Sequence, residues 1–358
     1  MVAVGAVQAY ALVQSTVRAL YSELLPRETW EALAQAPDYD ALLGMLARTP
    51  YGPYLEIDRS ELTARRTVYQ IRWYLADVYA KLIRISPEPA ASLLRTLWHH
   101  YEVDNIKVTL RGINTGASWR QVLHLLYPME LYTAVGTDHF RRMVRAGTMQ
   151  EALEVLRETE YYPILSHALA RYQEEQTPFP LEVALDLGYR RQLWASIHRL
   201  KGTDREMAMK TVGTALDTDN LLWAIRYRVY HKLSEMEIVN YTLPMGYEVE
   251  DADIRAIARG EDVLSVVLNV YPHLTEKLQG VAVDTGEGLQ QLEQAFLGML
   301  VERCRGMFVG SPFHIGLPLG YVWLNEYEIR DLTVIIEAKV SGLPPESFWP
   351  FLLLPRSR

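Results

Sequence analysis

The sequence predicts an all-α protein built from three diverged copies of one helical unit. Three observations predict this fold class. Apolar residues recur at spacings of three and four, alternating strand patterns are short, and two sequence themes return at intervals of about 110 residues. Most prolines lie between the helical runs, where they indicate helix boundaries: Pro50, Pro53, Pro87, Pro128, Pro163, Pro178, Pro180, Pro244 and Pro272.

Two segments illustrate the helical pattern. Residues 38–49 place Leu42, Met45 and Leu46 on one side of a helix. The longest helix is expected to begin near Ser86, a good N-cap residue followed by proline, and to stop at Gly116. The most strand-like stretch, residues 281–283, is too short to predict a sheet.

The first repeated theme is a pair of similar segments. LLGMLARTPYGPYL (residues 42–55) resembles ALEVLRETEYYPIL (residues 152–165) with a constant offset of 110. The matched pairs are Leu43 and Leu153, Leu46 and Leu156, Thr49 and Thr159, Tyr51 and Tyr161, Pro53 and Pro163, and Leu55 and Leu165. Such a match indicates duplication of a whole helical unit.

The second theme appears three times, as EVDNIKVTLRG, DTDNLLWAIRY and EIRDLTVIIEAK. An acid leads each copy (Glu102, Asp217, Glu328), and an amide or acid follows three residues later (Asn105, Asn220, Asp331). A basic residue follows six further on in two copies (Arg111, Arg226), where the third has Glu337. On a helix the asparagine falls at the edge of an apolar stripe, so it needs a hydrogen-bond partner, expected on a neighbouring helix. We interpret the theme as repeated packing chemistry and not as a catalytic site.

The two themes divide the chain into three helical repeat units, near residues 1–120, 121–235 and 236–358. No Ser/Gly-rich linker separates them, so we expect the units to pack on one another. Three units without obvious polar caps favour closure around a pseudo-threefold axis over open stacking.

Composition excludes several classes of function. The 358 residues carry a net charge of −8, which argues against a nucleic-acid-binding protein, and the cluster Arg141, Arg142 and Arg145 is interpreted as a solvated face. A single cysteine, Cys304, excludes an internal disulfide and fits a buried position in a reducing compartment. The N-terminal segment lacks signal-peptide features and no apolar run reaches about 18 residues, so we expect a soluble protein.

Acidic and histidine-rich motifs are the residues of this sequence that could form a chemical site. His99, His100, Glu102 and Asp104 could suggest a metal cluster, but the aligned part of the second unit has no histidine. Asp217 with Asp219, and Asp251 with Asp253, are two residues apart, and such pairs do not face each other on a helix. The glycine-bearing stretches 310–320 and 284–288 lack the lysine of a P-loop and are interpreted as loops entering helices. We therefore expect no catalytic, cofactor-binding or metal-binding residues.

The residues that carry a family resemblance are the EVDNIKVTLRG and DTDNLLWAIRYR themes, LPMG with the acidic segment at 243–251, and GYVWLNEYEIRDLTVIIEAKVSGLP at 320–344. Together, in this order, they resemble the C subunit of V/A-type (vacuolar/archaeal-type) ATPases, whose eukaryotic counterpart is called the d subunit. The resemblance runs from about Tyr10 to Leu352. Asp331 and Glu337 depart from the other copies, which puts in doubt only whether the third lobe makes the same contacts.

The resemblance implies three pseudo-threefold-related helical lobes that form a funnel with a central cavity. It implies a non-catalytic central-rotor subunit, without cofactors, that links the central stalk (the D and F subunits) to the membrane proteolipid ring and transmits torque for ATP-driven ion pumping or ATP synthesis. The expected location is cytoplasmic, peripheral on the ring, without direct membrane insertion and without nucleic-acid partners.

Two alternatives stay open at this point. An all-α scaffold with a helix-binding cavity, such as a solenoid, would be expected to show a shorter period of roughly 34–47 residues. A helical enzyme would be expected to bring acidic residues together in an open cavity. The positions of Glu102, Asp217 and Glu328 in space discriminate between the enzyme and the packing interpretation.

Overall fold

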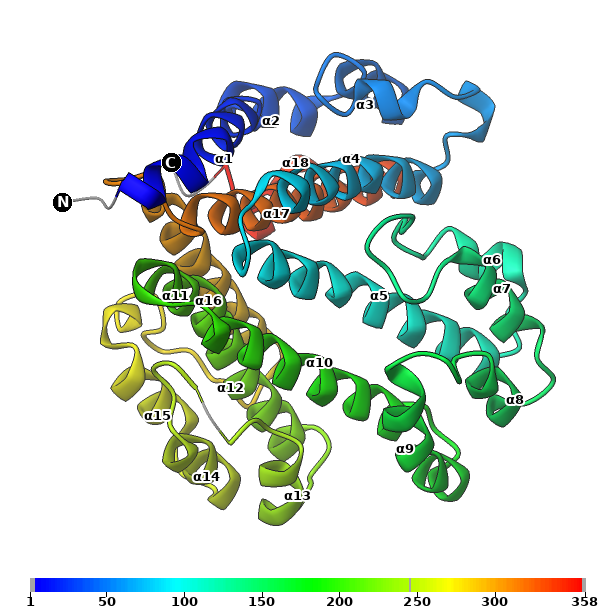
Figure 1. Cartoon of the computed structure of the whole chain (residues 1–358). Helices are drawn as coiled ribbons and strands as arrows, with labels where there is room; N and C mark the ends of the chain where they lie inside the picture. Colours follow the sequence, from blue (N-terminus) through cyan, green and yellow to red (C-terminus); the bar gives the residue numbers. More distant parts are fainter. Residues whose placement is uncertain (1–3, 245, 356–358) are drawn as a thin grey trace. The chain divides into compact units, whose positions relative to one another are not determined.

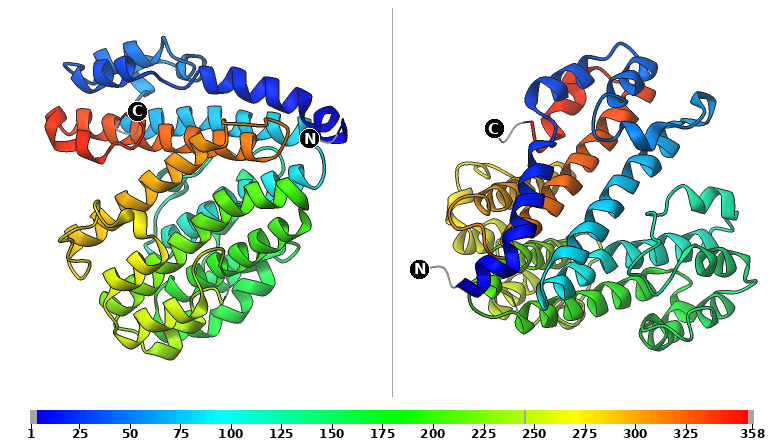
Figure 2. Two further views of the ribbon diagram at one scale, coloured as in Figure 1. Left: turned by 90° about the vertical axis from the view of Figure 1, so that its left-hand side faces the viewer. Right: turned by 45° about the horizontal axis from the view of Figure 1, so that its top comes forward.

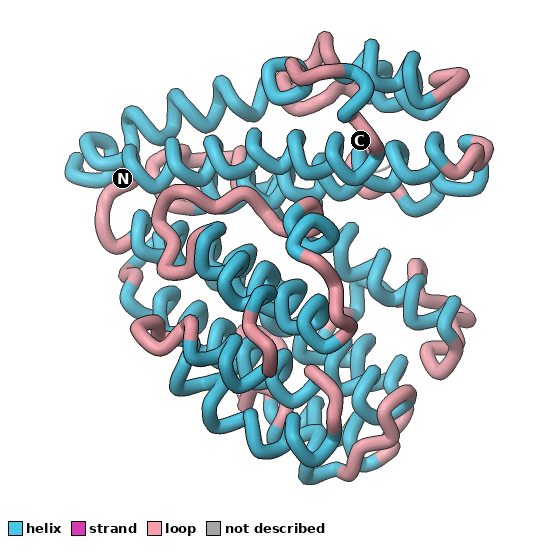
Figure 3. Tube along the Cα trace, turned by 90° about the vertical axis from the view of Figure 1, so that its right-hand side faces the viewer, coloured by secondary structure: helices cyan, strands magenta, loops and turns pink. Residues whose placement is uncertain are grey.

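The structure is a computed structural model that describes residues 4–244 and 246–355. Every regular element among these residues is a helix, which confirms the predicted all-α class, and the part of the chain drawn in Figure 3 contains helices and loops but no strand. Residues 281–283 accordingly lie in a loop. None of the described helices is both long and apolar enough to span a lipid bilayer.

The chain divides into two compact units. Unit 1 comprises the described residues of Met1–Arg18, Ile197–Leu324 and Phe351–Arg358, and unit 2 comprises Ala19–Ser196 and Asn325–Pro350. The boundaries fall inside three helices: α1 (Val4–Ser22), α10 (Phe179–Arg199) and α17 (Gly316–Val340).

Unit 2 holds the longer helices and a series of short ones around them. Its complete helices are α2 (Arg27–Gln35), α3 (Tyr39–Leu46), α4 (Ala64–Ile85), α5 (Ala90–Asn114), α6 (Trp119–Leu123), α7 (Thr137–Arg145), α8 (Met149–Glu154), α9 (Tyr161–Glu175) and α18 (Pro345–Phe348). Short 3₁₀ turns occupy Gly52–Leu55, Arg59–Glu61 and Trp349–Phe351, the last of which meets the boundary with unit 1. Helices α4 and α5 pack on each other, and α4 lies beside the part of α17 after residue 324 in both views of Figure 2.

Unit 1 is arranged around α12 (Thr214–Val229). Its other helices are α11 (Gly202–Ala208), α13 (Glu235–Asn240), α14 (Asp251–Arg259), α15 (Val263–Val270) and α16 (Gly286–Gly306), with a 3₁₀ turn at Pro272–Leu274. One turn of π-helix, Met209–Gly213, joins α11 to α12. Helix α12 contacts α13, α14 and α16. Figure 1 draws these helices in colours from green through yellow to orange.

The helix predicted over residues 38–49 is confirmed as α3. Asp38 is its N-cap and accepts a hydrogen bond from the Ala41 amide at 2.7 Å. Leu42 and Leu46 are completely buried. The apolar side of this helix therefore faces the core, as its spacing predicts.

The predicted start of the longest helix near Ser86 is wrong by about one turn. Ser86 ends α4 in an extended conformation, and α5 begins at Ala90. Glu88 still accepts a hydrogen bond from the Ser92 amide at 3.2 Å, which supplies an acceptor to the first turn. The predicted stop is confirmed, because Gly116 follows the helix end with a φ of +69°.

Candidate functional site

Glu102 on α5 is a fully buried carboxylate held by a loop and a tyrosine. Its Oε1 accepts hydrogen bonds from the Val135 amide and, at 2.6 Å, from the Thr133 hydroxyl. Its Oε2 accepts a hydrogen bond from the Tyr161 hydroxyl at 2.7 Å. One side chain therefore ties α5 to the loop before α7 and to the first residue of α9.

Glu328 on α17 makes the same kind of arrangement with a different part of unit 2. It is 2 % exposed. Its Oε2 accepts from the Leu25 amide and its Oε1 from the Tyr51 hydroxyl, both at 2.8 Å. The Asn325 amide also donates to the Tyr51 hydroxyl, at 3.2 Å.

Asp217 on α12 is the counterpart in unit 1. Its two oxygens accept hydrogen bonds from three consecutive amides, those of Tyr247 (2.8 Å), Glu248 (2.6 Å) and Val249 (3.2 Å). Burial raises the pKa of Asp217 to about 6, against the opposing effect of these three donors. Burial and then the charge of Asp217 raise the pKa of Tyr271, so this tyrosine also faces the carboxylate.

We call these arrangements the carboxylate joints: Glu102 with Tyr161, Asp217 with Tyr271, and Glu328 with Tyr51. The three tyrosines are 110 residues apart along the chain (51, 161, 271). All three are buried. The joints differ in one respect: the Tyr271 hydroxyl, unlike the other two, makes no hydrogen bond of normal geometry within the described residues.

The sequence comparison found Tyr51 and Tyr161 but missed Tyr271. The residues around Tyr271 diverge from the other two segments, so no local match reveals it. A weaker signal was available, because a proline follows each tyrosine within two residues: Pro53, Pro163 and Pro272.

The repeated asparagines form a second set of contacts. Asn105 donates to the Tyr127 carbonyl at 2.9 Å and accepts from the Tyr127 amide at 2.7 Å. Asn220 pairs in the same way with both backbone groups of Leu243, at 3.0 and 2.8 Å. The predicted need for a partner is confirmed, but the partner is the backbone of a loop and not a neighbouring helix. A primary amide can donate to the C=O and accept from the N–H of the same residue. One asparagine therefore fixes the loop through both backbone groups of a single residue.

The third copy differs, as its sequence indicates. Asp331 is completely buried, and its Oδ1 accepts from Arg330 at 2.9 Å. The repeated basic residues form ion pairs in two copies, Arg111 with Glu182 at 2.5 Å and Arg226 with Glu293. Glu337 carries the opposite charge at the third position.

The histidine-rich motif at residues 99–104 is divided among different partners. His100 lies 3.5 Å from Asp104, whose second oxygen is 2.9 Å from Lys107. Burial acts to raise the pKa of Asp104, but His100 and Lys107 outweigh it and hold the pKa below its usual range. Glu102 points to its own joint. Among the described residues, no group of three or more potential ligands could hold a metal ion.

The other acidic motif acts as a helix cap. Asp253 accepts from the Glu250 amide at 2.8 Å, and Asp251 pairs with Arg255 at 2.5 Å, both in the first turns of α14. Asp217 belongs to its joint. The i and i+2 acids therefore have separate structural roles.

The two glycine-bearing stretches are loops that enter helices, as predicted. Residues 310–315 lead into α17, where His314 accepts from the Gly316 amide at 3.0 Å. Thr285 caps α16 by accepting from the Gly288 amide at 3.0 Å. Cys304 is buried in the same helix.

The geometry of the joints suits packing and not catalysis. Each carboxylate is at most 2 % exposed and is occupied by backbone amides, joined by a tyrosine hydroxyl in two of the three joints. Glu102, Asp217 and Glu328 each have a separate set of partners, the arrangement expected from the packing interpretation. A general acid or base must reach a substrate proton, which buried and fully hydrogen-bonded groups do not.

Comparison with known proteins identifies the family. The model of the ATP synthase (C/AC39) subunit family matches residues 13–348. The chain belongs to this family. The matched range includes all three carboxylate joints.

Curated relatives carry a matching description. The C subunit of the A-type ATP synthase of Methanocaldococcus jannaschii is 25 % identical over 96 % of this chain and 86 % of the relative. The protein of the same description from Methanothermobacter thermautotrophicus is 24 % identical over 94 % and 86 %, and that from Methanosarcina mazei is 25 % identical over 94 % and 91 %. Family members therefore match this chain along nearly its whole length.

Proposed function

We propose that this chain is a non-catalytic central-rotor subunit of a V/A-type rotary ATPase. In this role it is a socket that links the central stalk, made of the D and F subunits, to the membrane proteolipid ring, and transmits torque for ATP-driven ion pumping or ATP synthesis. The observation that carries the proposal is the family match over residues 13–348. The relatives named above are described as subunits of A-type ATP synthases, which supports assignment to a complex of that kind.

The internal contacts are compatible with torque transmission. An adaptor between two rotating parts must not yield when it is twisted. The carboxylate joints each attach a loop to a long helix through buried, charge-assisted hydrogen bonds, which are about twice as strong as neutral ones. Close-packed interiors are also poorly compressible. Together these features make the elements of each unit resist local displacement.

We further propose that the chain consists of three copies of one unit, near residues 1–120, 121–235 and 236–358, arranged around a pseudo-threefold axis. The 110-residue spacing of Tyr51, Tyr161 and Tyr271 supports this proposal. The Glu328 joint uses Leu25 and Tyr51, so the third copy would be completed by residues from the first part of the chain.

Binding to isolated partners tests the function. Purified chain is incubated with a stalk D–F pair and, separately, with proteolipid rings in detergent. The proposal expects both to be retained with the chain, and the ternary assembly to form when all are mixed. Retention of neither partner would refute the socket role, and retention of the stalk pair alone would refute the link to the ring.

A second experiment addresses the character of the ring contact. Three lobes cannot match a ring of different order residue by residue, so we expect polar, forgiving contacts steered by charge. Binding to isolated rings should then weaken steadily as salt increases. Salt-independent binding would indicate an apolar interface instead.

A further inference from the structure

Helices α4, α6 and α7 and the loop before α7 surround a pocket of about 80 Å³ in unit 2. Four of its ten lining residues are aromatic: Tyr69, Trp73, Tyr127 and Phe140. Thr137 and Glu130 are exposed at its edge, so the pocket opens to solvent. This volume leaves room for part of one apolar or aromatic side chain from a partner.

The chain segments that line this pocket are basic although the protein as a whole is acidic. The two segments that form it, residues 64–73 and 119–145, contain seven arginines and two carboxylates, Glu130 and Asp138. The arginines are Arg65, Arg66, Arg72, Arg120, Arg141, Arg142 and Arg145. A chain with net charge −8 thus carries an excess of positive charge in the two segments that line this pocket.

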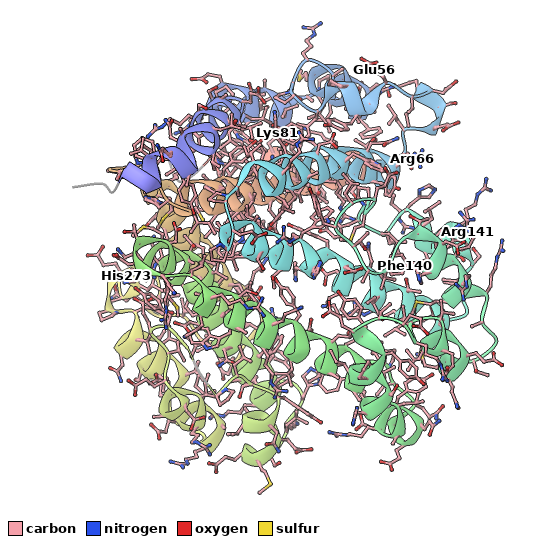
Figure 4. The ribbon with its side chains drawn as sticks, in the orientation of Figure 1. Glu56, Arg66, Lys81, Phe140, Arg141 and His273 are labelled. Carbon is pink, nitrogen blue, oxygen red and sulfur yellow. The ribbon has the colours of Figure 1, made fainter. Side chains whose placement is uncertain are left out.

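Several of the arginines are held in place by aromatic rings. The Arg72 guanidinium lies 4.0 Å from the centre of the Tyr127 ring, and that of Arg66 lies 5.5 Å from the centre of the Tyr69 ring. Arg141 lies 5.6 Å from the Trp119 ring. Stacking orders a guanidinium while leaving its N–H groups along the edge able to donate. Figure 4 labels Arg66, Arg141 and Phe140 in this region.

These arginines also lack intramolecular counter-ions. None of the seven forms an ion pair with a carboxylate anywhere in residues 4–244 and 246–355. Elsewhere in unit 2 arginines such as Arg111 and Arg157 do pair with glutamates. Acidic groups of a partner could therefore bind here without breaking an existing pair.

We propose that this surface docks an acidic polypeptide segment that inserts one apolar or aromatic side chain into the pocket. An apolar centre with arginines at its border is the usual anatomy of a protein–protein contact. The exposed Leu125 and Leu131 extend the apolar area beside the opening. The proposal concerns this surface alone and does not depend on the rotor function.

A lipid surface and nucleic acid fit these features less well. Anionic headgroups and phosphates are bound by positive charge without need of an apolar pocket. A polypeptide can pair its carboxylates with the arginines and, at the same time, place an uncharged apolar side chain in the pocket beside Glu130.

Binding of a synthetic probe tests the proposal with the whole chain. The probe is a short fluorescein-labelled peptide of glutamates with one central phenylalanine, followed by fluorescence anisotropy. Thr137→Trp fills the opening, and the triple variant Arg65→Glu, Arg120→Glu, Arg141→Glu reverses the border charge. All four side chains are exposed, so folding is retained and is verified by circular dichroism. Each variant should weaken binding by about tenfold or more.

A matched control separates the surface from overall charge. Lys81, Arg48 and Arg191 are also exposed cations of unit 2 without carboxylate partners among the described residues, and reversing all three gives the same net charge as the triple variant. The control should bind the probe within about twofold of the unaltered chain, the change expected from distant, screened charge. An equal loss in the control would overturn the proposal.

Two more binding measurements distinguish the proposed peptide site from a site for general negative charge and from a membrane-binding surface. A peptide with alanine in place of the phenylalanine should bind about tenfold more weakly, and equal binding would overturn the role of the pocket. Vesicles containing phosphatidylglycerol should not compete with the probe. Binding to these vesicles without binding to the peptide would assign the surface to a membrane, and absence of any peptide binding would overturn the proposal.

Discussion

At the scale of single residues, the carboxylate joints show how a buried charge is made stable in this fold. An isolated carboxylate in a protein interior is costly, but donors on both oxygens compensate for the lost hydration. Burial and the adjacent charge of Glu102 raise the pKa of Tyr161, so this tyrosine remains a donor throughout the neutral range. In the Glu102 and Glu328 joints, removing the tyrosine takes a hydrogen-bond donor from a buried carboxylate oxygen.

Replacement of a joint tyrosine measures this cost. We expect Tyr51→Phe to lower the free energy of unfolding by about 1–3 kcal/mol, because Glu328 loses a buried donor. Urea denaturation provides the measurement. Tyr54→Phe is the matched control, because the Tyr54 hydroxyl bonds to the exposed Asp77, and it should cost less than about 1 kcal/mol. Equal costs for the two variants would contradict the assigned role of the Glu328 joint.

Asp217 gives a prediction about pH. Its pKa of about 6 in the folded protein lies above the ordinary value of 3.8, so folding favours the protonated form. Its contribution to stability is therefore complete below pH 3.8 and is lost as the pH rises through 6. Relative to Asp217→Asn, the unaltered chain should lose up to about 3 kcal/mol between pH 4 and pH 7.5.

Urea denaturation of both proteins across this pH range tests the Asp217 prediction. A difference that instead grows in favour of the unaltered chain with rising pH would mean that the amides of Tyr247, Glu248 and Val249 outweigh burial. The sign of the slope thus identifies which physical effect dominates at this carboxylate.

At the scale of elements, the structure fixes loops to helices at single backbone positions. Asn105 and Asn220 each hold one loop residue by both its amide and its carbonyl. The loops before α7 and α14 are further held by Glu102 and Asp217. These loops are therefore parts of the packed structure, and their geometry depends on residues far from them in sequence.

Two glycines of α16 provide a matched pair of substitutions. A Cβ on Gly288 would lie 1.9 Å from the Ala282 carbonyl oxygen, whereas Gly298 has open space at that position. Gly288→Ala should lower the free energy of unfolding by more than about 2 kcal/mol, because backbone must move. Gly298→Ala should raise it by about 0.5–1 kcal/mol through helix propensity. Thermal and urea denaturation measure both, and a neutral Gly288→Ala would contradict the close packing at this helix start.

Sequence patterns predicted the elements better than the contacts between them. Helical spacing gave α3 correctly, and the stop at Gly116 followed from its tolerance of positive φ. The start of α5 was displaced because Ser86 suits a helix end as well as a beginning. The acids of the repeated theme were found, but their partners could not be, since a backbone amide such as that of Leu25 has no sequence signature.

At the scale of the whole molecule, the joints differ greatly in the length of chain that they close. Glu102 and Tyr161 are 59 residues apart, but Glu328 and Tyr51 are 277 apart. Bringing distant residues together costs more loop entropy, although the cost grows only slowly with length. The Glu328 joint thus fastens the beginning of unit 2 to its end.

Hydrogen exchange can show whether each joint protects its own loop. In Glu328→Ala we expect faster exchange of the Leu25 amide and unchanged exchange at Val135. In Glu102→Ala we expect the opposite result: faster exchange of the Val135 amide and unchanged exchange at Leu25. Simultaneous loss of protection at both amides in either variant would mean that the joints open together.

The Glu328 joint also has a consequence for synthesis on the ribosome. Leu25 and Tyr51 leave the exit tunnel long before Glu328 is made, because translation proceeds from the N-terminus. During that interval the nascent segment carries an apolar surface and polar groups whose final acceptor does not yet exist. A chaperone that shields the emerging N-terminal residues would therefore be needed from the emergence of Tyr51 until Glu328 has been translated.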